Sequence, residues 1–359
     1  MSGKTFHLRD RRTVAAWLRE TLSCFVREER LPSLPPDIDP RLAREAVRSR
    51  NLGPLLGSCP QDSSIPEQTR EQWRRERMNT MLRTMAAVKT AAAVTKTAAK
   101  AGVAVAAMRG AVLAQTLYPD PGARPMHDVD LLIRPEDRQA FLAAMAARGH
   151  HPAEHLRSQY VFSLNRVTVE VHWQLLSNKR YRDRLDSGVL VGSARPLPTP
   201  AGDLYRLDDR WELIGMVLHA FTHHNLGQIY SLVDIGLFMR NKKDFDWSEI
   251  ARWSRENSIG RMMALTLGFV DHLFGLGMEE RILSQFDAEI RQVARCYPPY
   301  LEQALDRITP ASHLALKRSQ FLVAESIGGK GRELLRLFSR RELRFVFDLL
   351  TGGPRTTGH

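Results

Sequence analysis

Residues 108–133 read MRGAVLAQTLYPDPGARPMHDVDLLI, and a second stretch at residues 167–173 reads VTVEVHW. The run DVDLLI is apolar apart from its two aspartates and predicts a strand. Alternate side chains of a strand share a face, so Asp128 and Asp130 project together. Glu170 has the same setting, because it lies between two valines in the second predicted strand. The pattern therefore predicts that three carboxylates from two strands converge on one face of a sheet.

Carboxylates that lie this close together repel one another unless a cation lies between them. Magnesium meets this need, because it prefers carboxylate oxygens, phosphate oxygens and water as ligands. Asp128, Asp130 and Glu170 are therefore the predicted metal ligands and catalytic residues of a site for phosphoryl transfer. Two Mg²⁺ ions are expected, as in other two-metal sites, with Mn²⁺ as the alternative.

These residues resemble the nucleotidyltransferase superfamily that includes DNA polymerase beta and the antibiotic nucleotidyltransferases. More narrowly, residues 100–240 carry RG, LYPDPGARPMHDVDLLI, VEVHW, HAFTHHN and LVDIGLF in order, which resembles a group of uncharacterised bacterial nucleotidyltransferases. The resemblance implies that Gly110 is the turn glycine beside the nucleotide phosphates, and that Asp128 and Asp130 are metal ligands. It also implies that Glu170 helps the acceptor hydroxyl to lose its proton.

The activity that this resemblance implies is transfer of a nucleoside monophosphate from an NTP, with ATP expected, and release of pyrophosphate. We expect the acceptor to be a hydroxyl or phosphate of a small molecule or peptide, as in a biosynthetic tailoring step. The alternatives are an RNA-modifying (tRNA) enzyme or toxin of the same fold, and a non-catalytic nucleotide-binding module. The net charge of +12 favours RNA, whereas the low aromatic content of 8% argues against a base-stacking track.

The positive charge for phosphate binding is expected from two arginines. The turn has Gly110 followed by alanine, where the superfamily often has Gly-Gly or Gly-Ser, so one phosphate contact is missing there. Arg109 and Arg124 can replace it, because a guanidinium binds phosphate in bidentate fashion. The alternative for both arginines is an ion pair with a surface carboxylate.

Three further residues, His172, His223 and Asp234, are candidates for an acceptor or nucleotide pocket. For His172, a half-buried structural role is favoured over a metal or substrate contact. His219 and His223 share a helix face, but no acidic residue stands between them as in a zinc protease helix, so packing or pocket lining is favoured over zinc. Asp234 lies in the apolar run VDIGLF and needs a partner. Either it faces the active site, or it pairs with an arginine of the C-terminal region.

The expected fold class is α+β, in a chain of 359 residues that is long enough for two domains. Apolar periodicity predicts helices at 10–30, 39–49, 67–101, 111–118 and 135–149, and then from 205 to 350 with loops near 241–246, 275–278 and 327–331. Strands are predicted at 103–108 and 128–133, with a hairpin that turns at Asn165-Arg166, and a loop at 50–66. The predicted parts are a helical N-terminal region (1–101), a nucleotidyltransferase core with a small mixed sheet (102–200), and a helical C-terminal domain (201–359).

Several classes of protein are excluded at this stage. The chain has no run of about 20 apolar residues for a membrane span, and its charged first residues are not a secretory signal. Cys24, Cys59 and Cys296 lie far apart, which indicates neither a disulfide framework nor a zinc site. A cytoplasmic protein is therefore expected. The basic stretch at 317–344 is expected to form an amphipathic helix against the body.

Overall fold

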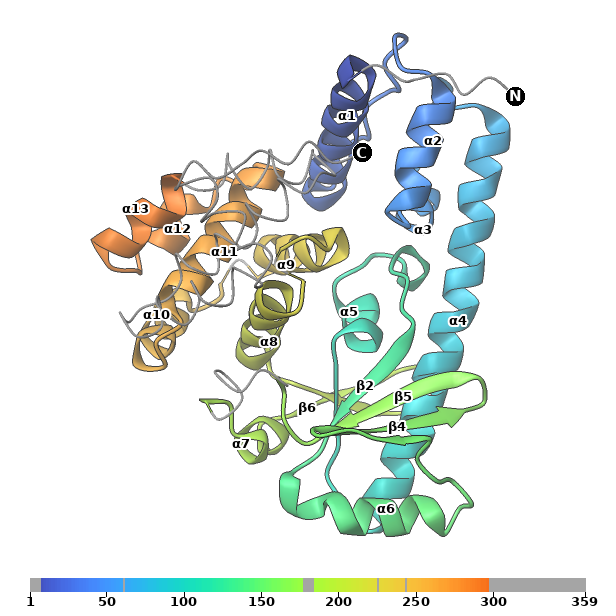
Figure 1. Ribbon diagram of the computed structural model, residues 1–359, viewed down its shortest axis with the longest axis vertical. Coiled ribbons are helices and arrows are strands. Elements are labelled where there is room, and N and C mark those ends of the chain that lie inside the picture. Colours follow the sequence, from blue (N-terminus) through green and yellow to red (C-terminus); the bar gives the residue numbers. More distant parts are fainter. Residues whose placement is uncertain (1–7, 61, 177–183, 225, 243, 297–359) are drawn as a thin grey trace, which may run out of the picture.

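The computed structural model describes residues 8–60, 62–176, 184–224, 226–242 and 244–296. It has a mixed sheet with a long helix across one face and a layer of helices beyond the other face (Figure 1). The expected α+β class is confirmed. In the described part of the chain, no helix has the length and apolar character that crossing a membrane requires. The basic stretch at 317–344 lies outside the described residues.

The helices and strands have the following bounds. The helices are α1 (Leu8–Arg27), α2 (Pro40–Ser49), α3 (Gly53–Gly57), α4 (Glu67–Lys100), α5 (Gly110–Thr116), α6 (Arg138–Ala146), α7 (Ser187–Gly192), α8 (Asp209–Thr222), α9 (Ile229–Asn241), α10 (Trp247–Glu256), α11 (Gly260–Phe274), α12 (Glu279–Leu283) and α13 (Ala288–Cys296). The strands are β1 (Ala106–Met108), β2 (Asp128–Leu132), β3 (Glu154–His155), β4 (Gln159–Leu164), β5 (Val167–His172), β6 (Arg195–Leu197) and β7 (Leu204–Arg206). Two short 3-10 turns are η1 (Pro121–Ala123) and η2 (Pro135–Asp137).

The sheet has the strand order β3-β4-β5-β2-β1-β7-β6. The β2–β5 and β1–β7 pairs are parallel, and the remaining neighbours are antiparallel. The predicted hairpin is confirmed as β4–β5, and Asn165 and Arg166 both have a positive φ, as a type I′ turn requires. In the central parallel pair, Asp130 lies opposite Glu170. Their side chains therefore project from the same face of the sheet.

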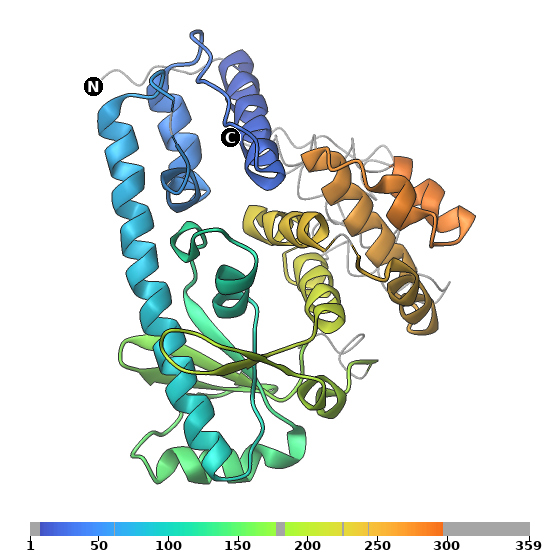
Figure 2. The same ribbon diagram turned by 180° about the vertical axis from the view of Figure 1, so that it is seen from behind.

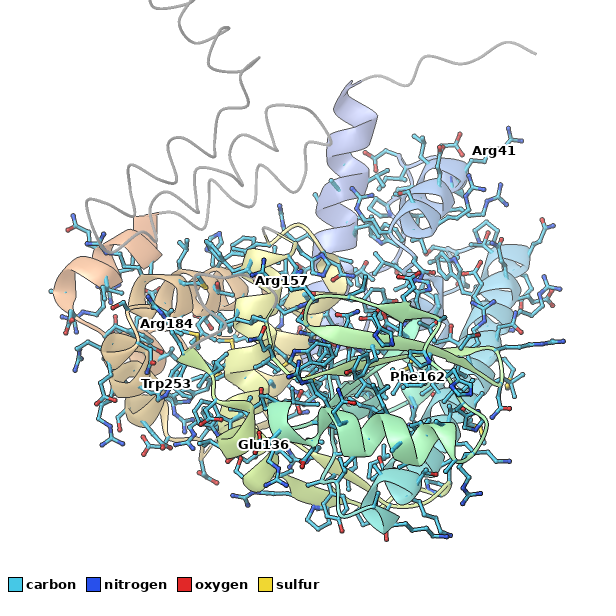
Figure 3. The ribbon with its side chains drawn as sticks, turned by 60° about the horizontal axis from the view of Figure 1, so that its bottom comes forward. Arg41, Glu136, Arg157, Phe162, Arg184 and Trp253 are labelled. Carbon is cyan, nitrogen blue, oxygen red and sulfur yellow. The ribbon has the colours of Figure 1, made fainter. Side chains whose placement is uncertain are left out.

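The opposite face of these two strands is apolar and is covered by α4 and α6 (Figure 2). Val129 and Val169 are fully buried there, against the alanine-rich second half of α4. Phe162 of β4 lies close to α6 (Figure 3), where its ring packs edge-on against Phe141 with centroids 6.1 Å apart. The alternation predicted from the sequence thus separates an apolar back face from an acidic front face.

A second hydrophobic cluster joins α1 and α2 to helices that follow the sheet in the sequence. Its members include Trp17 and Leu22 of α1, Val47 of α2, and many residues of α8, α9 and α11. Helix α1 contacts both α9 and α11. Helices α1 and α2 therefore pack with α8, α9 and α11 beyond the front face of the sheet (Figure 1), whereas α4, which was predicted as part of the same N-terminal region, covers the opposite face.

The predicted loop at 50–66 is wrong over Gly53–Gly57, which form helix α3. Leu55 and Leu56 are buried between α3 and its neighbours. A Cβ atom added at Gly57 would lie 2.2 Å from the carbonyl oxygen of Trp73 on α4. The glycine that suggested a loop is therefore needed for the close approach of two helices. Strands β3, β6 and β7 were also not predicted, because two or three residues are too few for alternation to show.

A buried ion pair connects the loop before β2 to helix α9. The Arg124 guanidinium donates to both carboxylate oxygens of Asp234, from Nε to Oδ1 at 2.9 Å and from Nη2 to Oδ2 at 2.7 Å. The Tyr118 hydroxyl donates to the same Oδ1 at 2.8 Å. The alternative partner expected for Asp234, an arginine of the C-terminal region, is wrong, since Arg124 precedes β2. This pair ties the helical layer to the sheet.

Replacing Asp234 with alanine should lower the free energy of unfolding by about 3–5 kcal/mol, because the Arg124 charge would stay buried without its partner. Urea denaturation at neutral pH measures the change. The matched control is Asp287→Ala, which removes the partner of Arg255 from an exposed pair. That variant should lose at most about 1 kcal/mol. Equal losses in both variants would contradict the role given to the buried pair.

Candidate active site

A cleft of about 870 Å³ lies between the front face of the sheet and helices α1, α8 and α9. Strands β2 and β5 supply its acidic residues, and the turn before α5 supplies its glycine. The predicted site residues all line this cleft, and they are Arg109, Gly110, Arg124, Asp128, Asp130, Glu170, His172, His223 and Asp234. The residues that the sequence pattern indicated as site candidates therefore all lie along a single cavity.

Asp130 is the most enclosed of the three carboxylates on the front face of the sheet, with 6% of its surface exposed. Its Oδ1 accepts a hydrogen bond from Arg109 Nη1 at 3.0 Å and lies 2.8 Å from His172 Nε2. Burial alone would raise the pKa of Asp130, but the positive charges of Arg109 and His172 hold it well below its usual range. Asp130 is therefore ionised at neutral pH.

His172 lies between Asp130 and Glu170. Its Nε2 is 3.5 Å from Glu170 Oε2, and the same oxygen accepts a hydrogen bond from Gln159 Nε2 at 2.7 Å. Burial alone would lower the pKa of His172, but its hydrogen bonds to the two carboxylates raise it. The hydrogen bond from His172 in turn lowers the pKa of Glu170. His172 is buried, with 6% of its surface exposed, and not half-buried as expected, and it contributes directly to the acidic face.

One ligand atom from each of Asp130, Glu170 and His172 lies within 4.8 Å of the others. Among the described residues this is the group whose spacing could hold a metal ion. Asp128 stands outside it, at the more exposed end of β2, so the compact set differs from the predicted one by containing the histidine. The spacing Glu170-x-His172 places both side chains on one strand face, and it was the feature of the sequence that indicated His172 as a member of this group.

The pKa of Asp128 is nevertheless shifted by the other two carboxylates. Burial raises its pKa, and the negative charges of Asp130 and Glu170 raise it further. Such repulsion is what a bound divalent cation relieves, and carboxylate oxygens are the ligands that Mg²⁺ and Mn²⁺ prefer. The residues present therefore fit a hard divalent ion. In this arrangement Arg109 and His172 supply the positive charge.

The turn that carries Arg109 is strained. Arg109 has φ 56° and ψ −131°, a region that residues other than glycine rarely adopt. Its Nη2 donates to the carbonyl of Leu175 at 2.9 Å, while Nη1 binds Asp130. At Gly110 an added Cβ would lie 3.2 Å from Arg124 Nη1 and 3.3 Å from Met126 Cβ. Arg109 and Arg124 thus both pair with carboxylates, as one alternative expected, but the pairs are buried and not on the surface.

Glu212 of α8 is a buried carboxyl group behind this turn that the sequence analysis missed. It faces the backbone N–H of Arg109, and burial raises its pKa to about 8. Its Oε2 has no hydrogen-bond partner among the described residues. At neutral pH Glu212 is therefore mostly protonated. Its only signal in the sequence is one glutamate in the otherwise apolar run WELIGMVL.

The elevated pKa of Glu212 predicts a specific pH dependence of stability. A carboxyl whose folded pKa is raised stabilises the folded state fully below its unfolded pKa of 4.5, and this contribution is lost as pH rises to about 8. The free energy of unfolding should fall over this window by up to about 1.4 kcal/mol per pH unit. Urea denaturation from pH 5 to pH 8.5 measures it.

Glu212→Gln should remove this contribution, so its stability relative to the unmodified chain should increase as pH rises. The exposed Glu256 provides the control, because Glu256→Gln should follow the unmodified chain at every pH. Parallel pH curves for the unmodified chain and Glu212→Gln would show that Glu212 is not protonated in the folded state.

Three histidines at the end of α8 form another wall of the cleft. His219 Nε2 lies 3.0 Å from His224 Nε2, and the His219 and His223 rings stack with centroids 4.8 Å apart. Burial and then the nearby Arg109 charge lower the pKa of His219 to about 2. Neutral imidazoles therefore line this wall. Within the described residues they do not form a compact group of metal ligands.

A family model described as an uncharacterised nucleotidyltransferase matches residues 36–275, about two thirds of the chain. The match includes every strand of the sheet and extends from the residues before α2 to the end of α11. It therefore contains all nine predicted site residues. No curated protein matches the chain.

Proposed function

We propose that this chain, which belongs to the uncharacterised nucleotidyltransferase family, moves a nucleoside monophosphate from an NTP onto an acceptor bound in the cleft. The observation that supports this most is the register that places Asp130 opposite Glu170 on the front face of the sheet, beside His172. ATP is the expected NTP. The expected acceptor is a hydroxyl or phosphate of a small molecule or a peptide.

Asp128, Asp130 and Glu170 would hold the divalent ions, with Mg²⁺ expected and Mn²⁺ as the alternative. When bound, these ions supply charge neutralisation for the transferred phosphoryl group and the leaving pyrophosphate. Glu170 is the carboxylate proposed to take the proton of an acceptor hydroxyl. It retains 26% side-chain exposure, against 8% for Asp130, and is therefore the more accessible of the two from the cleft.

Positioning and charge supply most of the catalysis in phosphoryl transfer, so the surrounding residues matter as much as the carboxylates. Gly110 allows the backbone and the phosphates to approach each other closely. Arg109 can exchange Asp130 for a phosphate oxygen while Nη2 keeps its bond to Leu175. Arg124 would have to leave Asp234 to do the same, and this makes Arg109 the stronger candidate for phosphate binding.

Binding of Mg²⁺ and ATP should raise the melting temperature, because a ligand that binds only the folded state stabilises it, by about 2.7 kcal/mol at 100 times its Kd. The rise should disappear with EDTA and in Asp130→Asn, and should persist in the exposed control Asp203→Asn. Thermal denaturation measures both effects. Equal stabilisation with and without metal would instead indicate a non-catalytic module that binds phosphate through arginine.

Transfer to RNA is the second candidate, and the net charge of +12 favours it. We expect bulk tRNA to bind at low salt, with a linear fall of log affinity against log salt, since counterions are released from each neutralised phosphate. We expect no transfer of label from an α-labelled NTP to the tRNA. Label on tRNA that requires both Mg²⁺ and Asp130 would establish RNA as the acceptor.

A further inference from the structure

The long helix α4 carries an exposed apolar stripe. Met78 is 51% exposed, Leu82 59% and Met85 57%. In both ribbon views α4 runs along one edge of the described part of the molecule (Figure 1 and Figure 2). We propose that two copies of this chain pair through this face of α4, with the two helices antiparallel. The proposal is independent of the proposed function.

The stripe has the spacing of a coiled-coil seam. From Glu71 to Lys89, its residues follow one another at alternating intervals of four and three positions, and all of them are exposed. With this heptad spacing one helix packs its side chains between those of another. Helix α4 runs through the whole stripe and contains no glycine or proline. The residues of the stripe are Glu71, Arg75, Met78, Leu82, Met85 and Lys89.

The other side of this part of α4 is already packed within the chain. Trp73, Thr80 and Thr84 are buried there, and α4 contacts α3 and η1. At Gly122 of η1, an added Cβ would lie 2.9 Å from the carbonyl oxygen of Arg77, so the two segments approach closely. The stripe is therefore presented from a helix that is held in place from behind. Such a surface loses less freedom when a partner binds.

The charges at the ends of the stripe favour a second copy in the antiparallel direction. If the two-fold axis passes level with Thr80, Met78 lies at the same level as Leu82 of the second copy. Glu71 and Lys89 are both nine residues from Thr80, about 13.5 Å along the helix axis. Glu71 of each copy then lies opposite Lys89 of the second copy. Parallel pairing would instead set like charges against each other at both ends.

The contact is small. The stripe is about 27 Å long and should bury less than the roughly 1,200–2,000 Å² of a standard interface. Arg75 lies level with Met85 of the second copy, and the methylene groups of the arginine stem can cover it. We therefore expect a reversible dimer with a Kd of about 10–100 µM. No residue of α4 lines the cleft, so the dimer leaves the cleft accessible.

The first experiment measures the Kd of the dimer by sedimentation equilibrium of the full chain, at concentrations up to about 0.2 mM. Leu82→Gln should raise the Kd at least about tenfold, because each dimer loses two leucines from its centre. The melting temperature of this variant in dilute solution should not change, since Leu82 is exposed in the single chain. The matched control is Leu156→Gln, at a leucine that is 46% exposed on β3.

The second experiment tests the direction of pairing. Glu71→Lys and Lys89→Glu, each alone, place like charges opposite each other and should raise the Kd about threefold or more at low salt. The double variant Glu71→Lys/Lys89→Glu restores both opposite pairs and should return the Kd to that of the unmodified chain. Arg83→Glu makes the same change in net charge as Lys89→Glu, at an exposed position outside the stripe, and should not weaken the dimer.

A monomer at every concentration would overturn the proposal, and a stripe that binds another partner or another segment of the chain would give this result. A dimer with the same Kd in Leu82→Gln and Leu156→Gln would also overturn it. A double charge variant as weak as the two single variants would contradict the antiparallel register. The proposed function is tested separately, because it depends on Asp130 and not on α4.

Discussion

The parallel pairing of β2 with β5 is the constraint on which the rest of the structure depends. It sets Asp130 opposite Glu170, so two carboxylates share one face of a central strand pair. Such a face is stable only with positive charge beside it. Arg109 and His172 provide that charge, and the valines on the other face hold the two strands against α4. The acidic face and the apolar core are thus two consequences of one register.

The helical layer turns this face into a cleft. Helices that precede the sheet in the sequence and helices that follow it form one hydrophobic cluster, and the ion pair between Arg124 and Asp234 ties that cluster to the loop before β2. A buried ion pair gains little net stability over apolar residues of the same size, because both charges lose their water. The contribution of this pair is geometric. It places α9 at a defined position opposite the sheet, and the width of the cleft follows from that position.

The sequence allowed prediction of whatever depends on local periodicity. The alternation around Asp128, Asp130 and Glu170 predicted the strands and their shared face, and the order of motifs predicted the family that the match over residues 36–275 confirms. Contacts between distant segments could not be predicted this way. The partner of Asp234 lies 110 residues earlier in the chain, and Glu212 is unusual only because the fold buries it behind Arg109. Helix α3 was missed because its glycines serve packing and not turns.

The pairing of Arg109 with Asp130 has a consequence for the order in which ligands arrive. Arg109 and His172 both use Oδ1 of Asp130, so they act as internal counter-ions of the acidic face. A bare metal ion has to compete with them and offers Arg109 no new partner. A metal ion that enters together with a nucleotide brings phosphate oxygens, which can receive the guanidinium as it leaves. On the proposed function, the cleft would therefore discriminate against free ions and admit the metal with its nucleotide, as a single complex.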